Sequence, residues 1–172
     1  MKKIILILSF AISLFAIELH KEAKNIILEG MNGGLAKDGS SWNFNSLKGR
    51  VSVLLYIDPD EKEVNKKFSQ LIEKQKFNKD SFVKVAVINL AATWKPDFVI
   101  EKILVTQQAD FPQNIYLKDK KSVFVKQWEL TDNASNVLIF SKDLKLLYQT
   151  DKAMNKEERQ KALKIINEAL VK

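Results

Sequence analysis

The residues best suited to chemistry in this 172-residue chain form an acidic corner after an apolar run. Its carboxylates belong to Asp58, Asp60, Glu61 and Glu63. Clustered carboxylates can bind a cation or act as a general acid and base. The same corner also fits a helix start, with Asp58 as N-cap, Pro59 as first helical residue and Glu61 at the third position. We expect the capped helix, with no catalytic residue; an enzyme using Asp60 and Glu61 is the alternative.

Cysteine is absent from the chain, and His20 is the single histidine. Thiol–disulfide exchange, peroxidase activity and structural disulfides all need cysteine, so the sequence excludes them. A zinc site built from histidines needs more than one of them. We therefore expect no metal site and no cofactor.

The formal net charge is +7, and Arg50 and Arg159 are the only arginines. Lysines alternate with acidic residues along the predicted helices, as in 61–63 and 157–161. Proteins that bind nucleic acids usually gather basic residues on one face and use arginine to contact bases. The pattern favours a lysine-rich solvated surface and no nucleic-acid partner.

The first 16 residues are typical of a secretory signal peptide. Lys2 and Lys3 precede the apolar stretch 4–15, which is short for a membrane span, and Ala16 marks the expected cleavage point. We expect a periplasmic protein without an integral membrane span after cleavage; a retained anchor is the alternative. The mature chain would comprise a β-rich N-terminal extension, 17–48, and a main domain, 49–172.

Hydrophobic periodicity predicts the elements of the main domain. Strands are expected at 51–57, 82–90, 114–117, 123–128, 136–140 and 144–149, and a further one at 42–47 in the extension. Helices are expected from the acidic corner onward, at 97–108, and at the C-terminus after an Asn155 cap with Glu158 as its partner. The second helix should bury Val99, Ile100, Ile103 and Leu104, and the last should bury Ala162, Leu163, Ile166, Ala169 and Leu170. Trp128 is expected in the core.

Several segments resemble a known superfamily. Residues 44–51 are similar to the lead-in of the peroxiredoxin and secreted thiol-reductase branch of thioredoxin-like proteins, and 111–112 with 126–128 resemble its insert. Residues 66–74, 87–89 and 128–130 resemble the YtfJ family of small periplasmic proteins, over about 43–170. The resemblance implies a single-domain α/β thioredoxin-like fold, with a mixed central sheet flanked by helices.

The chain departs from working thioredoxins at the reactive positions. Residues 61–64 stand where redox members carry Cys-x-x-Cys, and 134–136 stand where they carry a cis-proline. A redox-inactive member can still use the groove between these positions. The groove candidates are Pro59, Asp60, Glu61, Ser135 and Asn136, with Trp94 as an anchor or as a plainly exposed aromatic.

The function expected from this reading is a binding or chaperone-like module for an envelope protein or peptide. Two other classes stay open. One is the carboxylate-based enzyme. The other is an envelope-associated or regulatory protein, whose excess of lysines would attract it to envelope surfaces.

Overall fold

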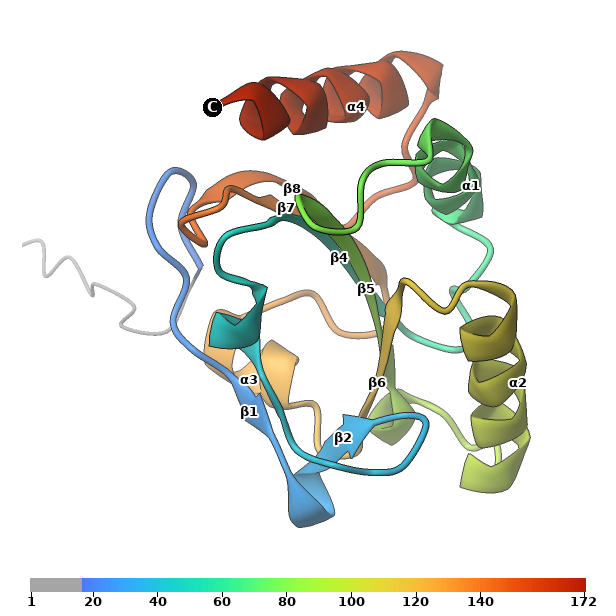
Figure 1. Cartoon of the computed structure of the whole chain (residues 1–172). Helices are drawn as coiled ribbons and strands as arrows, with labels where there is room; N and C mark the ends of the chain where they lie inside the picture. Colours follow the sequence, from blue (N-terminus) through green and yellow to red (C-terminus); the bar gives the residue numbers. More distant parts are fainter. Residues whose placement is uncertain (1–16) are drawn as a thin grey trace, which may run out of the picture.

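A six-stranded mixed sheet forms the centre of the computed structural model, which describes residues 17–172 (Figure 1). The predicted signal peptide lies outside the described residues. The strand order is β2-β6-β5-β4-β7-β8; β4, β5 and β6 run parallel, while β2, β7 and β8 pair antiparallel with their neighbours. The strands are β2 (Gly33–Leu35), β4 (Val51–Ile57), β5 (Phe82–Asn89), β6 (Ile115–Asp119), β7 (Ser135–Phe140) and β8 (Leu146–Thr150). The strands predicted at 51–57 and 82–90 and the hairpin predicted after residue 136 are confirmed.

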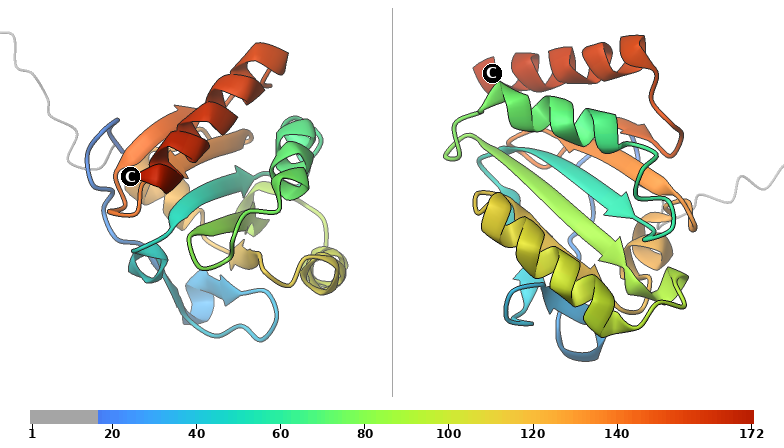
Figure 2. Two further views of the ribbon diagram at one scale, coloured as in Figure 1. Left: turned by 45° about the horizontal axis from the view of Figure 1, so that its top comes forward. Right: turned by 90° about the vertical axis from the view of Figure 1, so that its right-hand side faces the viewer.

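Three helices cover one face of this sheet, and a short helix covers the other (Figure 2). The first group is α1 (Lys66–Gln75), α2 (Asp97–Asp110) and α4 (Lys156–Val171). The second face holds α3 (Val123–Trp128) and the N-terminal lead-in. The lead-in consists of β1 (Ile27–Leu28) paired with β3 (Trp42–Asn43), and the turns η1 (Gly30–Asn32) and η2 (Phe44–Leu47). The 3-10 turn η3 (Leu90–Ala92) follows β5.

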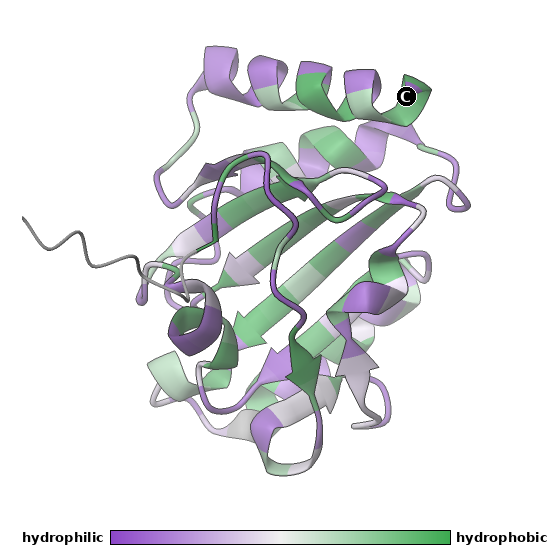
Figure 3. Cartoon of the chain, turned by 90° about the vertical axis from the view of Figure 1, so that its left-hand side faces the viewer, coloured by the Kyte–Doolittle hydropathy of each residue, from purple (hydrophilic) through white to green (hydrophobic). Residues whose placement is uncertain are grey.

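The central strands are apolar on both sides, as a strand covered on both faces must be. Along β5, Val83, Val85 and Val87 pack on the α3 face, while Lys84, Ala86 and Ile88 point toward α1 and α2. Figure 3 shows mostly hydrophobic strands beneath α4, whose outer turns are hydrophilic. The fold therefore presents two different surfaces of the same strands to its two layers of helices.

Aromatic side chains fill the α3 face. Phe44 packs edge-on against Trp128 and Phe140, with ring centroids 4.9 and 5.0 Å apart. The Trp128 indole N–H donates to the Lys24 carbonyl at 2.8 Å. Trp128 is fully buried, so its prediction as a core residue is confirmed. These contacts attach the lead-in to the sheet.

The predicted strand at 123–128 is wrong, because this segment is the helix α3. Its β-branched and aromatic residues favour strand, but tertiary contacts decide the outcome. The buried Asp119 carboxylate accepts a hydrogen bond from the Phe124 backbone N–H at 3.1 Å and another from the Tyr56 hydroxyl at 3.1 Å. The carboxylate thus satisfies a free N–H at the first turn of α3 from outside the helix.

The C-terminal helix follows the prediction. Asn155 and Glu158 form a reciprocal capping box, with bonds of 2.9 and 2.7 Å. Its fully buried residues are Ala162, Ile166 and Ala169, whereas Leu163 and Leu170 are half-buried.

The prediction for α2 is only partly right. Ile100 and Leu104 are buried against the sheet, but Val99 and Ile103 remain 39% and 51% exposed. The lead-in also differs at its end, since β3 stops at Asn43 and η2 continues to Leu47 where a strand was expected.

Glycines in the lead-in allow a close backbone approach rather than phosphate binding. A Cβ atom at Gly33 would lie 1.8 Å from the Lys118 carbonyl oxygen, and the φ of 131° there also favours glycine. This lets β2 pair with the edge of β6.

Candidate functional site

The acidic corner folds into turns, and the helix starts later than predicted, at Lys66. The Asp58 carboxylate accepts the Asp60 backbone N–H at 2.8 Å, and the Asp58 carbonyl accepts the Glu61 N–H at 2.9 Å. An aspartate that bonds its own backbone two residues on favours a turn over a helix. The prediction of Asp58 as the N-cap of this helix is therefore wrong, although Phe68 and Ile72 do form its buried stripe.

Asn65 holds the corner in place. Its buried side-chain amide donates to the carbonyls of Ser135 at 2.8 Å and Lys152 at 3.2 Å, and its oxygen accepts the Met154 N–H at 3.1 Å. The partners are backbone groups distant in sequence, so no sequence pattern points to this residue. It joins the start of α1 to the start of β7 and to the segment before α4.

The two walls of the predicted groove meet directly. The Asp58 N–H donates to the Ala134 carbonyl at 3.0 Å, and Ser135 and Asn136 are buried. The Asn136 amide donates to the Thr131 carbonyl at 2.8 Å. Residues 17–172 contain no cis peptide bond. Where redox members hold cysteines facing a cis-proline, this protein has a hydrogen-bonded contact.

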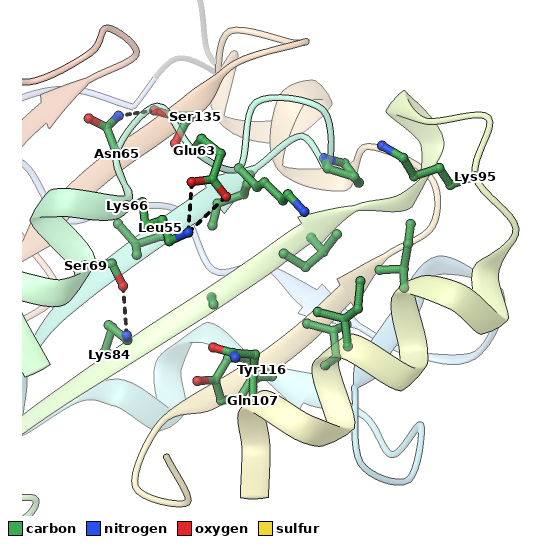
Figure 4. Close-up of a pocket in the computed structure, with 18 of the residues that line it drawn as sticks. Leu55, Glu63, Asn65, Lys66, Ser69, Lys84, Lys95, Gln107, Tyr116 and Ser135 are labelled. Carbon is green, nitrogen blue, oxygen red and sulfur yellow. Dashed lines mark hydrogen bonds and ion pairs between the residues drawn. The ribbon is translucent and has the colours of Figure 1, made fainter. Parts of the chain in front are cut away.

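A cavity of about 410 Å³ opens beside this contact, between α1 and α2 (Figure 4). We call it the α1/α2 cavity. Its apolar lining comes mainly from β4, β5 and α2: Leu55, Ile57, Ala86, Ile88, Ile100 and Leu104. A volume of this size lies within the range of ligand sites, about 300–1,000 Å³.

The structure brings only part of the predicted groove into this cavity. Pro59 and Ser135 line it. Asp60, Glu61 and Asn136 lie outside its lining, and so does Trp94, which is 85% exposed in the loop before α2. The apolar floor could not be assigned to a site from sequence, because the same residues read equally well as core.

Lysines surround the cavity, and most of them have acidic partners. Lys66 pairs with Glu63 at 2.9 Å, Lys95 pairs with Asp60, and Lys84 pairs with Glu73. Lys62 also lines the cavity, is exposed, and forms no hydrogen bond or ion pair with the side chains that the structure describes.

Lys84 differs from the other lysines because it is buried in the central strand β5. Its ammonium group donates to the Ser69 hydroxyl at 3.0 Å and lies 5.7 Å from the centre of the Phe111 ring. Its partner Glu73 also accepts from the Asn114 amide at 2.8 Å. A buried charge held by several partners is a fixed part of the structure rather than a free ligand contact.

Exposed apolar side chains continue from the cavity onto the outer surface of α2. Phe98 is 72% exposed, and Val99, Ile103 and Val105 are also exposed. Because Val99 and Ile103 line the cavity as well, the apolar surface is continuous from its interior to solvent. The helix is held to the sheet by Ile100 and Leu104 and by the ion pair between Lys118 and Glu101, at 2.7 Å.

A second hollow, between α1 and α4, is shallower and basic. Its volume is about 320 Å³, and its lining includes Lys67, Lys74, Lys156 and Arg159. The cations come from two helices that are far apart in sequence. Along each helix basic and acidic residues alternate, so the sequence did not predict this cluster. They are surface side chains without a buried polar group among them.

The predicted acid–base pair does not form an enclosed site. Asp60 is exposed and ion-paired, and neither Asp60 nor Glu61 lines the cavity. Among the side chains that the structure describes, no group of histidine, aspartate and glutamate could hold a metal ion. The buried pair of Tyr56 and Asp119 is structural: burial, followed by the nearby Asp119 charge, raises the pKa of the Tyr56 phenol well above its usual value, so the phenol stays a hydrogen-bond donor.

No helix among residues 17–172 is long and apolar enough to cross a membrane.

Solved structures with the same architecture are thioredoxin-like. A putative thiol:disulfide interchange protein DsbE from Chlorobium tepidum matches with a TM-score of 0.64 at 16% identity, covering 90% of this chain and 99% of that one. An uncharacterized conserved protein from Geobacillus kaustophilus matches with a TM-score of 0.66 at 19% identity, covering 90% and 83%. The pneumococcal exposed lipoprotein thioredoxin Etrx1 from Streptococcus pneumoniae TIGR4 matches at 0.57 and 15%, covering 82% and 98%. At these identities the likeness shows the fold alone, and it confirms the predicted fold class.

Sequence comparison gives the family. The uncharacterized protein YtfJ of Escherichia coli (strain K12) is 24% identical over 133 residues, covering 76% of this chain and 72% of that one. A family model described as a bacterial protein of unknown function, YtfJ_HI0045, matches residues 21–169. The resemblance predicted from sequence is thereby confirmed, and the chain belongs to the YtfJ_HI0045 family, as a thioredoxin-like member that contains no cysteine.

Proposed function

We propose that this protein is a non-enzymatic binding protein that takes up an apolar ligand in the α1/α2 cavity. The observation that carries the proposal is the cavity itself, whose apolar floor lies next to the position of the lost redox site. Ligand sites are concave, mostly apolar and bordered by a few polar groups. The fold keeps helices on both sides of this floor without filling it.

The proposal places the protein outside the cytoplasm. Residues 1–16 have the sequence of a signal peptide, and the fold is shared with a protein described as an exposed lipoprotein. N-terminal sequencing of the exported protein should begin at Ile17. An intact Met1 in the membrane fraction would instead indicate a retained anchor.

Binding can be tested with N-phenyl-1-naphthylamine, an uncharged dye that fluoresces in apolar surroundings. Ala86 lies on the floor of the cavity, so Ala86→Phe should occupy the space and reduce dye affinity at least tenfold. The matched control is Ala91→Phe, at an exposed position after β5. Circular dichroism would show that both variants are folded. Equal dye binding by wild type and a folded Ala86→Phe variant would exclude the cavity as the site.

Binding of unfolded polypeptide on the outer surface of α2 is a second candidate function. Phe98 and Val105 on α2 and Trp94 in the loop before it favour this function, since solvent-exposed apolar groups that lie together often mark interaction sites. A double variant, Trp94→Ser with Phe98→Ser, should then lose the ability to suppress aggregation of a reduced client protein while still binding the dye.

A further inference from the structure

We propose that the ligand of the α1/α2 cavity is an anionic amphiphile with a single hydrocarbon chain. This inference rests on the proposed binding function and names the chemistry of its ligand. The chain would lie along the floor, and the anionic group would sit at the end of the cavity near the acidic corner, where it meets Lys62.

The lining calls for a hydrocarbon ligand. The floor consists of apolar side chains from β4, β5 and α2, to which Ala86 adds only a methyl group. Two polar groups of the lining are already engaged: Lys84 with Glu73 and Ser69, and the Tyr116 hydroxyl with the Asn114 amide at 3.4 Å. A ligand with polar groups along its length would leave them unpaired against this floor, at a cost in affinity.

The backbone beneath the cavity disfavours a peptide as the occupant. The floor strands β4, β5 and β6 are all interior strands, each paired on both sides. They offer no free edge to which a peptide could add as a strand. Buried peptide groups would lack partners, whereas a hydrocarbon chain needs none.

The charges at the cavity select the sign of the head group. Of the four lysines that line the cavity, Lys66, Lys95 and Lys84 are paired with Glu63, Asp60 and Glu73, whereas Lys62 is paired with none of the described side chains. The pairs of Lys66 and Lys95 are solvent-accessible, and such pairs contribute little, so an anionic head group can share these two cations. A cationic head group would meet Lys62 with the same sign of charge.

Ion pairs tie these cations to the acidic corner: Lys95 pairs with Asp60, Lys66 pairs with Glu63, and Lys62 belongs to the corner itself. Figure 4 shows Lys95 on the loop before α2 and Lys66 beside Glu63 at the start of α1, while Gln107 and Tyr116 lie together away from both. Val99 and Ile103 on the open side are both exposed and part of the lining, so a chain can slide in between α2 and α1 without unfolding either helix. The cavity volume of about 410 Å³ is near the lower end of the usual range, which suits one chain rather than two.

The test displaces N-phenyl-1-naphthylamine from the full mature chain with three dodecyl compounds that differ in charge: dodecanoate, dodecanol and dodecyltrimethylammonium. We expect dodecanoate to bind at least tenfold more tightly than dodecyltrimethylammonium, with dodecanol between them. In a series of carboxylates, affinity should rise about fourfold for each added methylene until the chain fills the cavity. Equal or tighter binding of the cation, or no dependence on chain length, would overturn the proposal.

Charge reversal locates the head group. Lys62→Glu should weaken dodecanoate binding at least tenfold more than it weakens binding of the uncharged dye. The matched control is Lys67→Glu, on α1 but outside the lining of the cavity, and it should bind dodecanoate like the wild type. Equal effects of the two substitutions would refute a head group at Lys62, while retained dye binding would leave the proposed binding function standing.

Two further experiments distinguish a free amphiphile from a membrane surface and from a peptide. Vesicles of phosphatidylglycerol should bind no more tightly than monomeric dodecanoate, and an unstructured acidic peptide should not displace the dye. Binding to vesicles without binding of monomeric dodecanoate would point to a membrane surface and overturn the proposal. Displacement by the peptide but not by dodecanoate would do the same in favour of a peptide ligand. Failure of the dye to bind the wild type and every variant would instead refute the proposed function itself.

Discussion

The two faces of the central sheet use the same strands for opposite purposes. On the α3 face, Phe44, Phe124, Trp128 and Phe140 interlock with ring centroids about 5 Å apart. On the opposite face, the neighbouring residues Ala86 and Ile88 border a cavity that α1 and α2 leave open. The α3 face is filled, whereas the opposite face is filled beneath α1 and α4 and stays open between α1 and α2.

The first prediction contrasts a tryptophan of the packed face with one at the surface. Trp128→Ala should lower the free energy of unfolding by about 3–5 kcal/mol, because it empties the aromatic cluster and removes the bond to the Lys24 carbonyl. Trp94→Ala should change it by less than about 0.5 kcal/mol, since Trp94 is exposed. Urea unfolding of both variants measures the difference. Similar effects would contradict the assignment of the stabilising core to the α3 face.

Asn65 links the open face to the rest of the fold, so its removal should be nearly as costly. Asn65→Ala leaves the buried Met154 N–H and the Ser135 carbonyl without their partner, with an expected loss of about 2–3 kcal/mol. Asn167→Ala, on the exposed side of α4, is the control and should be close to neutral. If thermal unfolding gave the same midpoint for both variants, the Asn65 hydrogen bonds would not be what holds the acidic corner in place.

Enlarging a side chain should have opposite effects on the two faces. Val85→Phe adds volume to the packed face and should cost about 1–3 kcal/mol. Ala86→Leu projects into the cavity and should raise the free energy of unfolding by about 0.5–2 kcal/mol. Denaturant titration of the two variants gives the sign of the change in the free energy of unfolding. Equal destabilisation would mean that the cavity has no room for added carbon atoms.

The smallest effect concerns alkaline pH. Burial and then the Asp119 charge raise the pKa of Tyr56 in the folded state above its ordinary value of 10.0. The folded protein therefore keeps a proton that the unfolded chain releases, so this stabilisation is complete below pH 10 and declines above it. The slope should be about 1.4 kcal/mol per pH unit for one proton. Tyr56→Phe should remove this part of the decline, and an unchanged slope would contradict it.

The sequence predicted the strands and the last helix well because their signals are local. Alternating β-branched residues mark β5, and Asn155 with Glu158 marks the start of α4. It failed at α3, where Asp119 is held by Tyr56 of a distant strand and accepts the Phe124 N–H, and at the start of α1, where Asn65 bonds Ser135. The cavity was hidden for a similar reason: its floor reads as ordinary core, and only the spacing of α1 and α2 leaves it uncovered.

The most direct test of the binding proposal is a methyl NMR titration of the mature chain with N-phenyl-1-naphthylamine. The predicted result is a saturable shift of the Ile57, Ile88 and Ile103 methyl resonances, which line the cavity, while those of Val83 and Leu54 on the packed face stay in place. Shifts confined to the α3 face, or no shift in the cavity at saturating dye, would contradict the proposal.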